Sequence, residues 1–168
     1  FDVGDYSSGV LKKTVTYDEN LPGGSAILLT TVEFSDKSGR IVLKRTYAQI
    51  GSTVLAHDTY YVYDDHGNLA FALPPLMDAS NASLSSLIGN INALAYRYVY
   101  DRRNRLVEKQ LPGKGKEYVV YNTLDQPIMT QDALQRTRNE WVFTIYDAWG
   151  REAYTGKVTN TVDRPAVQ

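Results

Sequence analysis

The side chains best suited to acid–base chemistry or metal binding are the two histidines, His57 and His66, and neither has a partner at a metal-ligand spacing. His66 falls within a short polar turn, where an exposed side chain is expected. The chain has no cysteine, which excludes disulfides, thiolate metal sites and cysteine nucleophiles. It also lacks the Gly-x-Ser-x-Gly motif that marks one class of serine nucleophile. We therefore predict no catalytic, metal-binding or cofactor-binding residue and no enzyme activity.

Two further segments are partly similar to ligand-binding loops. Asp64 and Asp65 precede Asn68, but the Asp-x-Asp-x-Asp-Gly pattern of a calcium loop is missing. Lys114-Gly115-Lys116 lacks the glycine spacing and the Ser or Thr of a phosphate-binding loop. Turn chemistry explains both segments, because Asp64 can accept hydrogen bonds inside a turn and Pro112-Gly113 is typical of a strand end.

The charge balance argues against nucleic acid as a partner. Arg102, Arg103 and Arg105 stand beside Tyr98 and Tyr100, a combination that can contact nucleic acid. However, 18 Lys and Arg face 19 Asp and Glu, so the net charge is -1 and no basic field attracts phosphates. The three arginines fit a solvated turn better. The apolar runs are also far shorter than the ~20 residues of a membrane helix, so we predict no membrane insertion by this segment.

Tyrosine is the most unusual feature of the composition, with 13 copies. Tyrosines on an exposed sheet face can stack on sugar rings, which would make the chain a carbohydrate-binding or adhesive module. They can instead pack across neighbouring strands, each contact contributing about 0.5–1 kcal/mol. Their recurrence at equivalent places favours packing. Exposure of three or more of Tyr63, Tyr100, Tyr121 and Tyr146 in one groove would favour carbohydrate binding.

Many of these tyrosines introduce a repeated short turn, Tyr-Asp-x-x-Gly or a close variant. An Asp or Asn at its first corner can accept a backbone hydrogen bond from two residues further on. Gly, Asn or Asp at its end tolerates the positive φ that forms a bulge between paired strands. We therefore predict positive φ at Gly39, Gly67, Asn104, Asp125 and Gly150. The predicted turn residues are Asp36, Gly39, Tyr63, Asp64, Gly67, Tyr100, Asp101, Asn104, Tyr121, Asn122, Asp125, Tyr146, Asp147 and Gly150.

The segments on either side of the turns must be strands, since they are rich in aromatic and β-branched residues that alternate along the chain. Between residues 78 and 94 the pattern changes, and apolar residues recur at helical spacing. The sequence thus predicts an all-β fold, an antiparallel sheet of successive β-hairpins, with one short α-helix inserted near 80–94. We divide the chain into N-terminal strands (1–34), hairpin repeats (35–156) with the helical insertion 78–94, and a flexible tail or linker (157–168). Because it starts at Phe1 with no leader pattern, we expect it to be a segment of a longer protein.

The hairpins resemble the YD repeats of Rhs proteins and of teneurin-like shells. Tyr63–Leu69 and Tyr146–Arg151 carry the pattern best, and segments 59–75, 111–116 and 141–156 are similar to Rhs-type wall-associated proteins of Bacteroides-like bacteria. Ser35, Asp125 and Pro127 depart from the pattern.

The resemblance implies a non-catalytic structural segment of a β-shell or surface scaffold that carries or encloses a C-terminal toxin or effector, as in a polymorphic toxin. The implied partners are flanking repeats of the same polypeptide, together with such a toxin or effector domain or a surface glycan. The implied location is secreted or at the cell envelope and cell surface.

Overall fold

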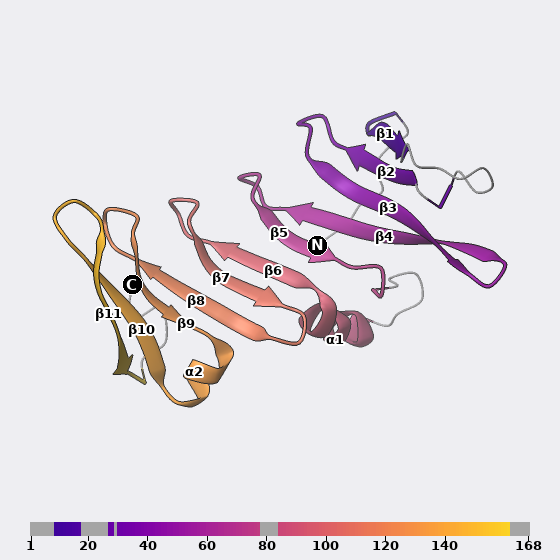
Figure 1. The fold of residues 1–168 in the computed structure, drawn as a ribbon. Helices are drawn as coiled ribbons and strands as arrows, with labels where there is room; N and C mark the ends of the chain where they lie inside the picture. Colours follow the sequence, from indigo (N-terminus) through magenta and orange to yellow (C-terminus); the bar gives the residue numbers. More distant parts are fainter. Residues whose placement is uncertain (1–8, 18–26, 29, 78–83, 162–168) are drawn as a thin grey trace.

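The computed structural model describes residues 9–17, 27–28, 30–77 and 84–161. Within them, eleven strands form a single antiparallel sheet in which each strand pairs with the next along the chain (Figure 1). This confirms the predicted all-β fold of successive hairpins. The strands are β1 (Lys12–Tyr17), β2 (Thr30–Ser35), β3 (Ile41–Ile50), β4 (Thr53–Tyr63), β5 (Leu69–Leu73), β6 (Tyr96–Tyr100), β7 (Leu106–Leu111), β8 (Gly115–Tyr121), β9 (Pro127–Gln131), β10 (Glu140–Tyr146) and β11 (Glu152–Thr159).

The sheet is a long strip with two different edges. The five predicted turns follow β2, β4, β6, β8 and β10, and they lie side by side along one long edge (Figure 1). The helices lie toward the opposite edge. This arrangement follows from the strand order, because every second connection in an up-and-down antiparallel sheet returns to the same edge.

Helix α1 (Leu84–Leu94) occupies the predicted insertion, and residues 78–83 lie outside the described part. A second helix, α2 (Ala133–Thr137), was not predicted. It is too short for an apolar period to reveal it, and its signal is a capping box. In this box Asp132 accepts from the backbone N–H of Gln135, while the Gln135 side chain accepts from the backbone N–H of Asp132.

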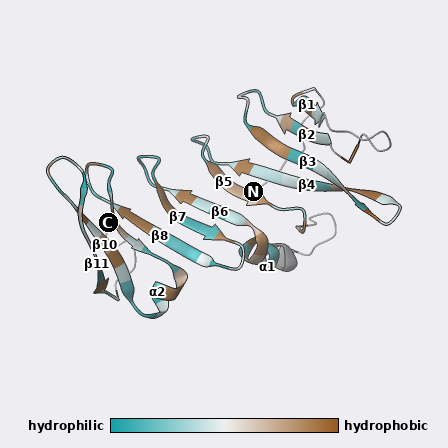
Figure 2. Cartoon of the chain, viewed as in Figure 1, coloured by the Kyte–Doolittle hydropathy of each residue, from teal (hydrophilic) through white to brown (hydrophobic). Residues whose placement is uncertain are grey.

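Few side chains are fully buried, because one layer of sheet leaves both faces open over much of its length. Figure 2 shows apolar and polar residues mixed along the strands. Trp141, Val107 and Val120 are the largest fully buried side chains among the described residues. With so little shared core, each hairpin depends mainly on its neighbours, as in repeat proteins.

The ends of the array differ in part from the predicted boundaries. The predicted N-terminal strands are present as β1 and β2, which pair with each other and, through β2, with β3. At the other end β11 continues to Thr159, past the predicted end of the hairpins at 156, so the tail predicted for 157–168 begins with strand residues. Within the described residues, no helix has the length and apolar character needed to cross a membrane.

Candidate functional site

Each of the five turns is organised by its Asp or Asn side chain. One side-chain oxygen accepts hydrogen bonds from two backbone N–H groups, two and four residues further along the chain. In the third turn, Asp101 accepts in this way from Arg103 and Arg105, at 2.8 and 3.0 Å. The same pair of bonds occurs at Asp36, Asp64, Asn122 and Asp147. The sequence predicted the first bond of each pair, and the structure adds the second.

The residue that ends each turn has a left-handed backbone. The φ angles are 81° at Gly39, 84° at Gly67, 58° at Asn104, 62° at Asp125 and 79° at Gly150, so the predicted positive φ is confirmed at all five. The strand register shifts at the residue before each Asp or Asn, which is the predicted bulge. We call these five the turn-ending residues. The residues directly after them, Arg40, Asn68, Arg105, Gln126 and Arg151, are the post-turn residues.

The turns hold their aspartates ionised. At Asp147, the backbone hydrogen bond from Arg151 is the main reason that the carboxyl pKa lies below its ordinary value. At Asp101, burial opposes ionisation, but hydrogen bonds from the backbone and side chain of Arg105 and the backbone of Arg103 outweigh it, so the pKa is again lowered. These shifts have a structural cause and need no substrate.

Tyrosine hydroxyls join three of the hairpins to the hairpin before them. The Tyr63 hydroxyl donates to the Ile41 carbonyl at 2.9 Å, and the Tyr121 hydroxyl donates to the Leu106 carbonyl at 3.0 Å. Tyr146 makes the same bond to the carbonyl of Pro127. In every case the acceptor directly follows the post-turn residue of the preceding turn. Burial raises the pKa of these three tyrosines and of Tyr100.

The first four post-turn side chains form a second set of joints, because each of them lies against the next turn-ending residue. Asn68 Nδ2 donates to Asn104 Oδ1 at 3.2 Å, and Arg105 Nη1 donates to Asp125 Oδ1 at 2.8 Å. Where the next turn ends in glycine, the post-turn side chain occupies the space that a Cβ of that residue would need. A Cβ placed on Gly67 would lie 3.3 Å from Arg40 Nη1, and one on Gly150 would lie 3.2 Å from Gln126 Nε2.

Two post-turn arginines also cover the next tyrosine. The guanidinium of Arg40 lies 5.0 Å from the ring centre of Tyr63, and that of Arg105 lies 4.8 Å from the ring centre of Tyr121. Arg105 also donates to the Asn122 carbonyl. We call this continuous set of contacts between neighbouring turns the turn row.

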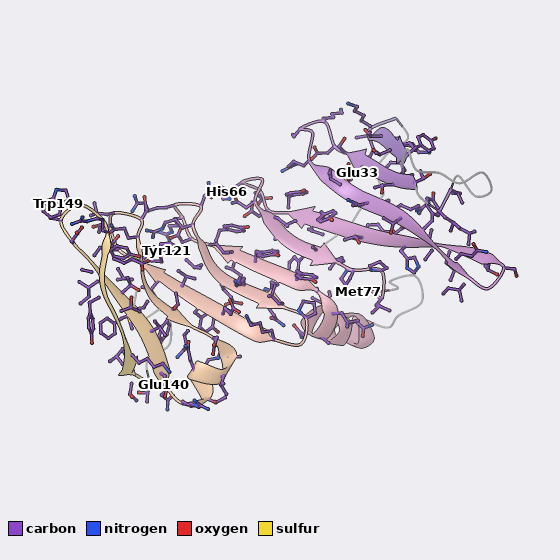
Figure 3. The ribbon with its side chains drawn as sticks, in the orientation of Figure 1. Glu33, His66, Met77, Tyr121, Glu140 and Trp149 are labelled. Carbon is purple, nitrogen blue, oxygen red and sulfur yellow. The ribbon has the colours of Figure 1, made fainter. Side chains whose placement is uncertain are left out.

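Structural contacts explain several residues whose types resemble ligand-binding residues in the sequence. Arg103 donates to the Thr123 carbonyl and pairs with Asp125 at 3.0 Å, so it connects two turns as Arg105 does. His66 and Trp149 stand at the tips of their turns, and Tyr121 lies at the base of its turn (Figure 3). Lys114 and Lys116 pair with Glu117 and Glu108, respectively. Within the described part of the chain, no three His, Asp or Glu side chains are grouped as metal ligands.

The four turn tyrosines do not meet the condition set for carbohydrate binding. Tyr63, Tyr100, Tyr121 and Tyr146 are all half-buried, so none of them is an exposed tyrosine. A different group, Tyr61, Tyr96 and Tyr98, lines an open depression above Ala72. Sequence reasoning missed the joints between turns, although the sequence carried a signal for them. Each post-turn residue has a side chain that can donate a hydrogen bond.

Comparisons with known proteins connect this geometry to a fold. No family model and no curated protein sequence matches the chain. Solved structures do match, among them three described as TcdB2-TccC3-Cdc42, TcdB2-TccC3 without hypervariable C-terminal region, and TcdB2-TccC3-TEV, with TM-scores of 0.60, 0.59 and 0.60. Each is 17% identical to this chain and aligns with 77% of it, but the chain spans only 6% of the matched chain. The strip of hairpins therefore shares the fold of a small part of these much larger chains.

Proposed function

We propose that the chain is a non-catalytic structural segment of a larger Rhs/YD-repeat protein, and that its hairpins extend a β-wall that carries or encloses a C-terminal toxin or effector. The observation that carries the proposal is the turn row. In all four neighbouring pairs of turns the post-turn side chain lies against the next turn-ending residue, through a hydrogen bond in two pairs and by close approach to a glycine in the other two. A joint repeated in this way serves to stack hairpins, whereas a binding site needs its residues in one place only.

The comparisons support a role as part of something much longer, because the similar chains exceed this one many times in length. One of these structures is described as being without a hypervariable C-terminal region. A β-wall of repeats followed by a C-terminal region of variable sequence suits a protein that carries different toxins or effectors at its C-terminus. The proposal includes secretion or display at the cell envelope and flanking repeats of the same polypeptide as the direct partners.

The wall function can be tested in the protein that contains this segment. Removing residues 96–131, which form two complete hairpins, should open the wall and expose whatever follows it to protease. Deleting 112–131 instead removes one hairpin with its connection and should give intermediate exposure. Limited proteolysis followed by mass spectrometry measures the protection. Unchanged protection after both deletions would contradict an enclosing wall.

The second candidate function is carbohydrate binding, and the depression lined by Tyr61, Tyr96 and Tyr98 favours it. Tyr61 on β4 and Tyr96 on β6 are the cross-strand partners of Ala72 on β5, so a small residue lies between two aromatic ones in this depression. A glycan array probed with the chain tests this function. Tyr96→Ala should abolish any binding, while Tyr154→Ala, at an exposed tyrosine outside the depression, should leave it unchanged.

A further inference from the structure

The junction between β5 and β6 differs from the other places where one hairpin meets the next. Strands β5 and β6 pair at only two positions, Phe71 with Arg97 and Ala72 with Tyr96. By comparison, β3 and β4 pair at eight positions, and β7 and β8 pair at four. Little backbone pairing therefore holds the hairpin β4–β5 against the hairpin β6–β7.

This junction also lacks the tyrosine bond that joins other hairpins. Tyr63, Tyr121 and Tyr146 each donate a hydrogen bond to a carbonyl of the preceding hairpin. The equivalent bond here would run from Tyr100 to the Leu69 carbonyl. Within the part of the chain that the structure describes, however, the Tyr100 hydroxyl makes no hydrogen bond. Its ring is half-buried at the junction without joining the two hairpins.

The post-turn residue at this junction is Asn68, which has no guanidinium to place over the next tyrosine. Where the post-turn residue is Arg40 or Arg105, the guanidinium lies over that ring. Asn68 instead donates one hydrogen bond of 3.2 Å to Asn104. Between described residues, this is the one side-chain hydrogen bond that crosses the junction, and it is exposed to solvent.

The junction between β9 and β10 shows what a short pairing needs in order to be firm. It also has only two paired positions. Two side chains reinforce it, because Tyr146 donates to the Pro127 carbonyl and Gln131 donates to the Glu140 carbonyl, each at 3.0 Å. The β5–β6 junction has the short pairing without this reinforcement.

Side chains beside the β5–β6 junction make their contacts on one side of it. Gln110 Nε2 donates to the Asn92 carbonyl at 2.7 Å, so α1 is tied to β7. Arg97 lies 3.8 Å from Glu108, which also belongs to β7. The tyrosine-lined depression opens across the junction, with lining residues from both β4 and β6. Helix α1 and the charged side chains thus move with β6 and β7.

From these differences we propose that the β5–β6 junction is a hinge between two blocks of hairpins, residues 30–77 and 84–161. The missing tyrosine bond and the missing arginine contact cause it. The hinge is a property of this sheet. Its use, as the place where the wall bends or opens, rests on the proposed function, because a wall made from one strip changes shape most easily where its hairpins are least joined.

Distances between turn tips measure the hinge. The chain has no cysteine, so spin labels attach only at introduced ones. Lys37, Arg102 and Ala148 occupy the same exposed tip position in the first, third and fifth turns. Labels at Lys37→Cys and Arg102→Cys span the junction, whereas labels at Arg102→Cys and Ala148→Cys lie within the second block. Both pairs are four strands apart, or roughly 20 Å. Electron–electron double resonance should give a broad distance distribution for the first pair and a narrow one for the second, and equal widths would overturn the inference.

A repaired joint tests the cause. Asn68→Arg supplies a guanidinium for the ring of Tyr100, so it should narrow the first distribution toward the width of the second. Asp65→Arg, at the exposed tip of the same turn, places a guanidinium away from that ring and should leave the width unchanged. A width that is the same in Asn68→Arg as in the unaltered chain would contradict the stated cause and overturn the inference.

Hydrogen exchange of the unlabelled chain provides an independent measurement. Strands β5 and β9 are both five residues long, and each pairs with the following hairpin at two positions. The β5 amide that faces β6, at Phe71 or Ala72, should exchange roughly twofold to tenfold faster than the β9 amide that faces β10, at Met129 or Thr130, after correction for intrinsic rates. Equal protection of the two amides would overturn the hinge.

The outcomes separate the hinge from the wall function. A strip that is rigid in both measurements overturns the hinge and leaves the wall standing. A hinge found in this chain, together with unchanged protease protection after both deletions in the containing protein, removes the wall and leaves the hinge.

Discussion

Replacing Tyr121 with phenylalanine isolates one joint of the turn row. The change removes the hydroxyl that donates to the Leu106 carbonyl at 3.0 Å, and it keeps the ring that lies 4.8 Å from the Arg105 guanidinium. A neutral hydrogen bond of this length, between half-buried groups, contributes about 0.5–1.5 kcal/mol to the free energy of unfolding. We expect Tyr121→Phe to destabilise the chain by about 1 kcal/mol, or roughly 2–4 °C in the thermal midpoint.

Two further variants calibrate that value. Tyr154→Phe removes a hydroxyl from a tyrosine that is 61% exposed, so its midpoint should match that of the unaltered chain. Tyr121→Ala removes the ring as well, and it should cost about 2–3 kcal/mol more than Tyr121→Phe because packing and the contact with Arg105 are also lost.

The pH dependence gives an independent measurement on the same residue. Burial raises the pKa of Tyr121 above its ordinary value of 10, so folding favours the neutral phenol. Its contribution is fully present below pH 10 and is lost as the pH rises through the higher pKa of the folded state. Stability should therefore fall above pH 10, and less steeply in Tyr121→Phe. Equal urea midpoints for Tyr121→Phe, Tyr154→Phe and the unaltered chain, together with equal alkaline slopes, would refute the account of the turn tyrosines as joints.

Three other predictions concern backbone and charge. Gly113→Ala should lower the free energy of unfolding by about 1–2 kcal/mol, because φ is 70° although the space around it is open. Gly115→Ala should lower it by about 1–3 kcal/mol more, because the new Cβ would lie 2.9 Å from the Cβ of Ala133. Equal urea midpoints for the two variants would show that α2 moves away without cost. Asn139→Gly should raise the free energy of unfolding by a few tenths to about 1 kcal/mol, since Asn139 is exposed with φ of 53°, and a loss of stability would count against this helix end. The lowered pKa of Asp101 contributes stability that is present above pH 4 and is lost as the pH falls through the folded-state pKa. In Asp101→Asn, the free energy of unfolding measured in urea should therefore decrease less on acidification. An unchanged dependence on acidic pH would contradict the hydrogen-bonded carboxylate.

Most of the fold was predictable because its signals are local. An Asp or Asn at one corner and a residue that tolerates positive φ at the other specify each turn within a few residues, and alternation specifies the strands between them. Helix α1 was predictable for the same reason, since its apolar stripe covers several turns of helix. Helix α2 escaped because a five-residue helix shows no period, and only the pair Asp132 and Gln135 marks it.

The sequence by itself thus determined where the five repeated turns lie, that the last residue of each adopts positive φ and that the strands follow one another as hairpins. The tertiary structure decided what the turns do to one another. Arg105 meets Asp125, and Tyr121 meets the Leu106 carbonyl, only because strand register brings successive turns into one row. Such contacts join residues 15 to 20 positions apart, so they depend on the pairing of whole strands and not on any local pattern.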